Sequence, residues 1–149
     1  MGCDIHFIIE KKFTSDDGGA SWIGVFDKYE TPRMRTDKEP VEAPEGFRVW
    51  NRNSVFGDRW YAFFAALAGV RGDGPEPNGL PEDISELAQA IVDEYGQDGH
   101  SHSHLPYREF CHRYSVVSGE VFKDADIEYL SGLNDSEIDA YRVVFFFDN

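Results

Sequence analysis

YRVVFFF, the stretch from Tyr141 to Phe147, is apolar at nearly every position. A strand with one solvated face alternates apolar and polar side chains, whereas a strand covered on both faces reads as a continuous apolar run. The stretch therefore predicts a strand in the middle of a sheet. A terminal strand this apolar needs neighbours, and the first strand of the chain is the natural candidate.

The opening segment, Cys3 to Glu10, alternates as a strand does, with its odd-numbered residues on one face and its even-numbered residues on the other. On this pattern Cys3 is a buried core thiol. A turn rich in Asp and Gly at residues 15–19 separates this segment from a second candidate strand, Trp22 to Phe26. Together the two strands predict an N-terminal hairpin.

Helices are expected at three places, where apolar spacing coincides with capping residues. They run from about Gly57 to Gly69 (capped by Asn53 or Ser54), from Pro81 with Glu82 and Asp83 to Tyr95, and from Pro106 to Tyr114. Before the second helix the sequence predicts a Pro-rich loop at 31–46 and a short strand at 47–50, and between the second and third helices it predicts a polar loop at 97–104. After the third helix we expect a strand pair or extended loop at 115–122, a helix at 124–133 and an acidic segment at 135–140. The pattern predicts an α+β fold in which a small mixed or antiparallel sheet holds both terminal strands, with three to four helices packed on one side.

Composition restricts the class of protein. The chain has 149 residues, which suits one compact domain over residues 1–149. No run of 18 or more apolar residues and no secretory signal pattern occur, so we expect neither a membrane span nor export. Two cysteines, Cys3 and Cys111, are too few for a disulfide scaffold and suit a reducing compartment.

The charge is strongly negative, at −14, and unevenly distributed. Residues 1–72 hold 11 acidic and 10 basic side chains, whereas residues 73–149 hold 17 acidic and 4 basic ones. A surface this acidic repels phosphate backbones, so binding to polymeric nucleic acid is disfavoured. Two interpretations remain: a solvated acidic surface, or an acidic mimic of nucleic acid that is offered to a basic partner.

Three of the five histidines, His100, His102 and His104, alternate with serines directly after Asp98. In an extended segment, positions i, i+2 and i+4 share one face, so these imidazoles are expected to converge on one ion. Asp98 adds a carboxylate, either as a ligand or as a group that orients a histidine. The alternative is a solvated loop whose histidines have no function.

Asp4 and His6 share a face of the first strand and present two further ligands at one strand edge. The composite hypothesis is a single divalent site built from Asp4, His6, Asp98 and His100, with His102 or His104 assisting. Nitrogen and oxygen ligands without thiolate suit Zn²⁺, Mn²⁺ or Fe²⁺. Such an ion polarises a phosphoryl or carbonyl group and lowers the pKa of a bound water, although the same ligands can also hold a zinc ion that only pins the loop to the sheet.

Aromatic residues near Asn51 to Asn53 suggest a small-nucleotide pocket in which a ring stacks on the base. Arg48 or Arg52 would then contact a phosphate. Core packing is the alternative role for these aromatic side chains.

Three segments together resemble a family of small proteins encoded by tailed bacteriophages and prophages. They are the opening Met1-Gly-Cys-Asp-Ile-His6, the loop Asp98-Gly-His-Ser-His-Ser103, and the ending Arg142-Val-Val-Phe-Phe-Phe-Asp-Asn149. The similarity extends to Arg52-Asn53, to the aromatic helix ending in Gly69-Val70-Arg71, and to the turn Gly79–Ser85. The sequence departs from the commoner pattern at Tyr107. The resemblance implies a phage origin and a bacterial host cytoplasm, and it implies no particular reaction.

From these observations we expect a metal-dependent hydrolase, a phosphoesterase that acts on a nucleotide or another small phosphate ester. Asp4, His6, Asp98 and His100 would hold the metal, while Ser101 or His102 orients the water or donates a proton. The alternative is a non-enzymatic protein that sequesters a nucleotide or antagonises a host protein, acting through its acidic C-terminal half. The expected partner is therefore a small molecule or a host protein, with no membrane involved.

Overall fold

The computed structural model describes residues 2–27, 50–51, 59–119 and 135–149. Its elements in chain order are β1 (Asp4–Thr14), β2 (Ala20–Asp27), β3 (Trp50–Asn51), α1 (Tyr61–Ala68), α2 (Glu86–Tyr95), the 3₁₀ turn η2 (Gly96–Asp98), β4 (Gly99–Pro106), α3 (Tyr107–Ser118), α4 (Asp135–Ile138) and β5 (Tyr141–Asp148). The predicted mixed α+β fold is confirmed. The predictions for residues 28–49, 52–58 and 120–134, which include the loop at 31–46 and the helix at 124–133, lie outside the described residues. Helix α1 begins at Tyr61 with Trp60 in the cap position, so the predicted start near Gly57 with Asn53 or Ser54 as the cap is wrong.

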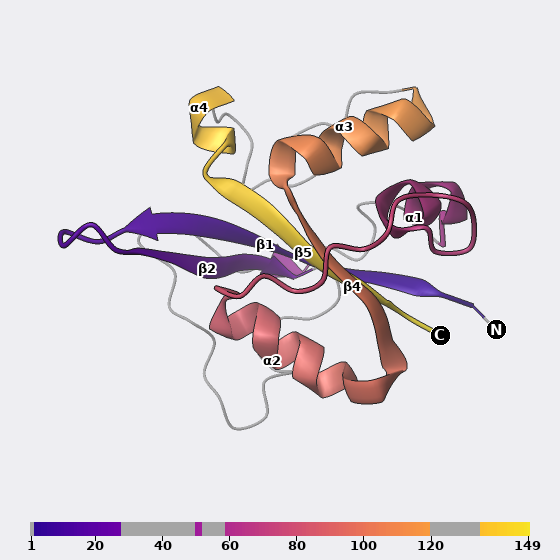
Figure 1. The fold of residues 1–149 in the computed structure, drawn as a ribbon, viewed down its shortest axis with the longest axis horizontal. Coiled ribbons are helices and arrows are strands. Elements are labelled where there is room, and N and C mark those ends of the chain that lie inside the picture. Colours follow the sequence, from indigo (N-terminus) through magenta and orange to yellow (C-terminus); the bar gives the residue numbers. More distant parts are fainter. Residues whose placement is uncertain (1, 28–49, 52–58, 120–134) are drawn as a thin grey trace.

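The sheet has the strand order β3-β2-β1-β5-β4, and its four long strands are antiparallel to their neighbours. The two-residue β3 runs parallel to β2. Strand β5 lies between β1 and β4, as its apolar sequence predicts. Both chain ends therefore meet at one end of the sheet (Figure 1).

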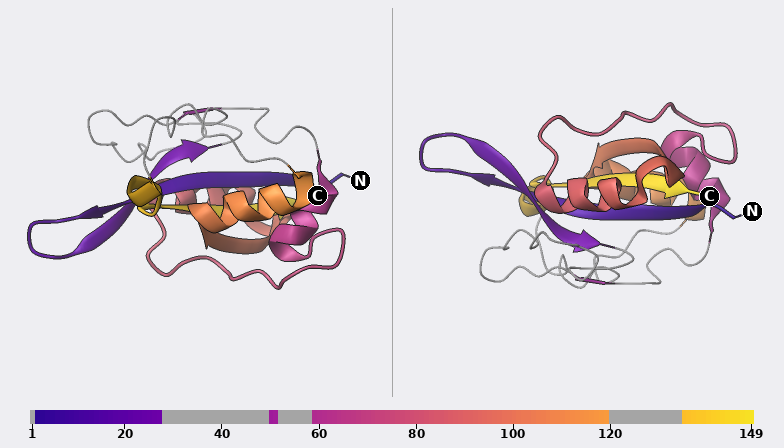
Figure 2. Two further views of the ribbon diagram at one scale, coloured as in Figure 1. Left: turned by 90° about the horizontal axis from the view of Figure 1, so that it is seen from above. Right: turned by 90° about the horizontal axis from the view of Figure 1, so that it is seen from below.

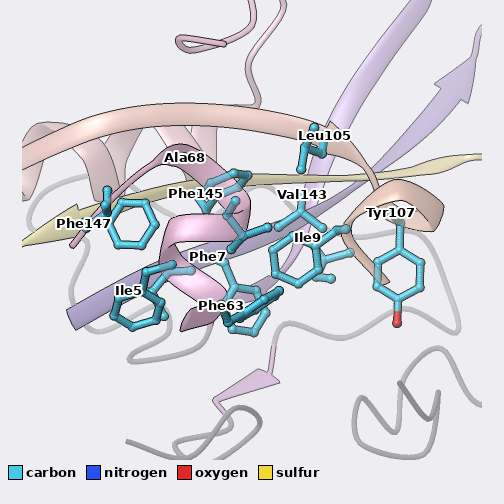
Figure 3. Close-up of a cluster of buried hydrophobic side chains, with 14 of the residues drawn as sticks. Ile5, Phe7, Ile9, Phe63, Ala68, Leu105, Tyr107, Val143, Phe145 and Phe147 are labelled. Atoms are coloured by element: carbon cyan, nitrogen blue, oxygen red, sulfur yellow. The ribbon is translucent and has the colours of Figure 1, made fainter. Parts of the chain in front are cut away.

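The side chains of β5 alternate between two cores. Val143, Phe145 and Phe147 join the larger core with α1 and α3, whereas Val144 and Phe146 join the smaller core with α2. Figure 2 shows α3 in front of the strands from above and α2 in front from below, and Figure 3 shows part of the larger core. The expectation that all helices pack on one side is wrong, because a strand buried on both faces needs a cover on each.

Three further elements differ from the sequence prediction. The polar segment expected as a loop at 97–104 forms strand β4 from Gly99 onward, because its backbone pairs with β5. Helix α3 continues to Ser118, through a part of the segment expected to be extended, and ends at Gly119 in the left-handed conformation (φ 74°). Helix α2 begins three residues beyond the predicted acidic start, with Ser85 as its cap accepting a hydrogen bond from the Ala88 amide.

A buried ion network joins β1, β5 and the start of α2. Glu10, which is fully buried, pairs with Arg142 on the neighbouring strand and accepts a hydrogen bond from the Ser85 amide at 2.6 Å. Arg142 Nη1 also lies 2.7 Å from Asp83 Oδ1. The Arg142 guanidinium beside Asp83 holds the pKa of that carboxyl below its usual range. The network therefore fixes the position of α2 against the sheet.

We predict that Glu10→Gln lowers the free energy of unfolding by about 3–5 kcal/mol, because it leaves a buried guanidinium without its main counter-charge. Urea denaturation of the variant measures this loss. The matched control is Arg108→Ala, which breaks the exposed pair with Asp139 and should cost no more than about 1 kcal/mol. Equal losses in the two variants would show that the buried network does not stabilise the fold.

Candidate functional site

The end of the sheet where β1 begins and β5 finishes carries a buried histidine. His6 is 3% exposed, and its Nε2 lies 3.2 Å from Asp148 Oδ2. The ring is enclosed by Tyr95 at the end of α2 (centroid separation 4.1 Å) and by Phe146 on β5 (5.1 Å). The result is a carboxylate–imidazole pair packed against two aromatic rings that also contact each other, at a centroid separation of 5.2 Å.

A β-bulge shapes the neighbouring strand β4. The register is interrupted between His100 and Ser103, so Ser101 and His102 together oppose the single residue Phe146. Ser101 has a φ of 54°, the left-handed conformation that glycine usually supplies at such a bulge. A side chain other than glycine in this position stores backbone strain, which is found most often at functional sites.

The bulge separates the histidines that the sequence suggested would share a face. His100 pairs with Phe147 and stacks on its ring at 6.2 Å, on the side of α1. His102 stacks on Phe146 at 5.3 Å, on the side of α2. The expectation that His100, His102 and His104 line one face is therefore wrong, because one extra residue reverses the alternation of the strand.

His102 occupies the same face as His6, with the Phe146 ring between them. Burial lowers the pKa of His102, and the nearby His100 lowers it further, so its neutral form is favoured. The Nε2 atoms of His100 and His102 are both buried, and neither forms a hydrogen bond among the described residues. His102 therefore has a buried Nε2 without a hydrogen-bond partner among the described residues, and a pKa shifted toward the neutral form.

His104 is held in a structural role. Its Nδ1 lies 2.8 Å from the Gly79 carbonyl oxygen, and the Gly79 amide donates to the His102 carbonyl at 2.9 Å. The Asn78 amide likewise donates to Ser103 Oγ at 2.9 Å. These bonds bind the segment before α2 to the outer edge of β4.

The remaining predicted site residues are dispersed. Asp4 receives a hydrogen bond from Arg59 Nε at 2.9 Å, and Asp98 is exposed at the end of η2. Ser101 Oγ lies 3.0 Å from His100 Nδ1. In the described part of the chain, no three His, Cys, Asp or Glu side chains come together as a preformed metal site. The structure thus keeps Asp4 and His6 on one strand face and does not bring Asp98, His100 and His104 to them, while Arg48 and Arg52 lie outside the described residues.

Sequence reasoning missed Asp148 and Tyr95. Asp148 was within reach of prediction, because antiparallel pairing of the two terminal strands places it opposite Asp4 and beside His6. Tyr95 is the last residue of the predicted helix, and only the packing of α2 against the sheet reveals its ring beside His6.

A second cluster lies on the opposite face of this end. Cys3 is fully buried, and burial raises the pKa of its thiol although the adjacent Arg71 guanidinium opposes the shift. Arg71 has a φ of 60° and lies over the Tyr61 ring at 5.5 Å. The Tyr61 hydroxyl accepts a hydrogen bond from the Cys3 amide at 3.2 Å. A thiol with a raised pKa is a poor nucleophile, so this cluster packs the chain end and does not supply a reactive cysteine.

The comparisons with known proteins identify no relative: no protein-family model, curated protein or solved structure matches the chain. Within the described residues, no helix is long and apolar enough to cross a membrane.

We predict that Ser101→Gly is more stable than Ser101→Ala by about 1 kcal/mol, since only glycine relieves the left-handed backbone. Both variants lose the same hydroxyl, so the difference between their free energies of unfolding measures the backbone strain at residue 101. Thermal and urea unfolding of the pair measure it. Equal stability would mean that the bulge carries no strain at Ser101.

We also predict that the free energy of unfolding falls as the pH is lowered below about 6.5. The lowered pKa of His102 means that the unfolded chain takes up a proton in this range before the folded chain does. Urea unfolding between pH 7.5 and 5 should show a smaller fall in His102→Gln than in the wild type. His112→Gln, which changes an exposed histidine on α3, is the control and should retain the wild-type slope. An unchanged slope in His102→Gln would contradict the prediction.

Proposed function

We propose that this protein is a metal-dependent hydrolase of small phosphate esters, with its metal bound at the end of the sheet by His6, Asp148 and Asp4. One observation carries the proposal: the buried His6 Nε2 lies 3.2 Å from Asp148 Oδ2. Two ligands of one transition-metal ion, each at about 2.0–2.2 Å from it, lie roughly 3.0–3.5 Å apart. The observed separation suits both atoms as ligands of one ion.

Asp4 is the proposed third ligand. It is the cross-strand partner of Asp148 and lies two residues before His6, so all three side chains leave the sheet on one face. Its carboxylate is now paired with Arg59, and both side chains of this pair are exposed, at 38% for Asp4 and 52% for Arg59. An exposed ion pair contributes little, so Asp4 can exchange the guanidinium for a metal ion at small cost. One imidazole and two carboxylates suit Zn²⁺, Mn²⁺ or Fe²⁺ and leave coordination positions open.

His102 is the proposed general base. Like His6, it stacks on Phe146, so the Phe146 ring lies between the two imidazoles and His102 is left out of the proposed ligand set. In the proposed reaction its neutral imidazole takes a proton from a water molecule, whose oxygen attacks phosphorus. The phosphorus–oxygen ester bond then breaks, and the leaving alcohol takes the proton back from the imidazolium. The acidic surface favours a small ester over polymeric nucleic acid.

A second candidate, a non-enzymatic binding protein, is favoured by a different observation. Between Arg71 and Arg108 the sequence contains eight acidic residues and no lysine or arginine, and all eight are exposed. These exposed carboxylates repel anions and attract a basic partner. Metal-dependent turnover separates the first candidate from the second.

The test is metal binding by the wild type and by Asp148→Asn, Asp4→Asn and His6→Gln. Elemental analysis and calorimetry with Zn²⁺ and Mn²⁺ should give about one equivalent in the wild type. Each variant should weaken binding by more than about 100-fold, because even groups that only orient a ligand are worth 10–100-fold. Turnover of p-nitrophenyl phosphate and of a mononucleotide should fall in parallel.

Asp98→Asn is the matched control, since Asp98 is an exposed carboxylate outside the proposed ligand set. It should bind metal as the wild type does. Asp4→Asn changes an exposed side chain and keeps the test decisive if His6→Gln does not fold. Failure of the wild type to bind either ion, or binding as tight as that of the wild type by Asp4→Asn and Asp148→Asn, overturns the proposal.

A further inference from the structure

A hollow of about 400 Å³ opens between β2 and the first turn of α2. It is lined by two short segments, Ala20–Ile23 and Asp83–Glu86. Helix α2 has ten residues, so this hollow lies about 15 Å along the helix from Tyr95 and the proposed metal site. It is a separate feature, and nothing in the proposed hydrolysis uses it.

The aromatic wall of the hollow is held in a fixed orientation. The Trp22 indole donates from Nε1 to Asp83 Oδ2 at 3.0 Å, and the Arg142 guanidinium lies over the ring at 4.0 Å from its centroid. Arg142 is itself held by the fully buried Glu10. A ring fixed by two polar contacts loses little freedom when a ligand binds against it.

The rim of the hollow is negatively charged. The Asp83 side chain is 64% exposed and pairs with Arg142, whereas Glu86 is exposed and adds a second carboxylate; the lining residues themselves include no lysine or arginine. The Arg142 hydrogen bond keeps the pKa of Asp83 below its usual range, so this carboxylate stays ionised near neutral pH. The same carboxylates disfavour an anion, even though the hollow borders the N-terminus of α2.

We infer that the hollow binds an alkyl ammonium or guanidinium group, with the alkyl chain against Trp22 and the cationic head at Asp83 and Glu86. An aromatic face beside carboxylates attracts a cation through both the ring quadrupole and charge. The hollow is large enough for a side chain the size of lysine or arginine. The cation comes either from a free diamine-type metabolite or from a basic side chain of a protein partner.

The test uses agmatine as the free cation and Nα-acetyl-lysine amide as the surrogate for a protein side chain. Binding is followed by NMR through the indole Nε1–H signal of Trp22, which is assigned by its loss in Trp22→Leu. In the wild-type protein we expect both cations to shift the indole Nε1–H signal saturably. The cation that binds more tightly identifies whether the natural ligand is a free metabolite or a protein side chain. Glu86→Gln should weaken binding by at least about tenfold in this titration. Trp22→Leu lacks the reporter signal, so its affinity is measured by calorimetry and should fall by a similar factor.

Two controls keep the outcome decisive. Glu76→Gln removes an equally exposed carboxylate outside the hollow and should leave binding unchanged. The Nε-acetylated lysine derivative keeps the alkyl chain without its charge and should not bind. Absence of any shift up to 20 mM ligand, an equal effect of Glu76→Gln and Glu86→Gln, or equal binding of the acetylated derivative overturns the inference. Metal binding plays no part in these readouts, so the proposed hydrolase site is tested separately.

Discussion

The burial of β5 on both faces is the constraint on which the rest of this structure depends. A strand without a solvated face must be paired along both edges and covered on both sides, since its backbone groups and its side chains have no access to water. The first requirement places β1 and β4 beside it, and the second places α1 and α3 on one face and α2 on the other. The arrangement of the described elements therefore follows from seven residues near the C-terminus.

The two charged side chains of β5 lie at its opposite ends, and each has a partner on β1. At one end Arg142 pairs with Glu10, which is fully buried and further tied to the start of α2. At the other end Asp148 pairs with His6 beneath the last residue of α2. The first pair is an ion network whose loss leaves an uncompensated buried charge. The second includes an imidazole, which can ligate a metal, so the two ends have different chemical capacities.

The sequence was informative where side-chain pattern and backbone pairing agree. The terminal strands, the first hairpin and the ends of α1 and α2 at glycines follow from alternation and capping alone. Strand β4 was not recognised, because its His and Ser side chains are polar and its strand character comes from pairing with β5. The bulge at Ser101 could not be predicted from the sequence either, because no sequence pattern indicates that a serine has a left-handed backbone conformation. For this reason the sequence places Asp4 and His6 together on one strand, while it does not separate His100 from His102.

Backbone strain gives an independent reason to look for function at that end. Among the described residues, two non-glycine side chains have positive φ, Arg71 and Ser101. Arg71 lies beside Cys3 at the start of β1, and Ser101 lies opposite Phe146, the residue between His6 and His102. A fold that needed only stability would place glycine at such positions, as it does at Gly69 and Gly119 after α1 and α3. Retaining a hydroxyl and a guanidinium there costs stability, and backbone strain of this kind clusters at functional sites.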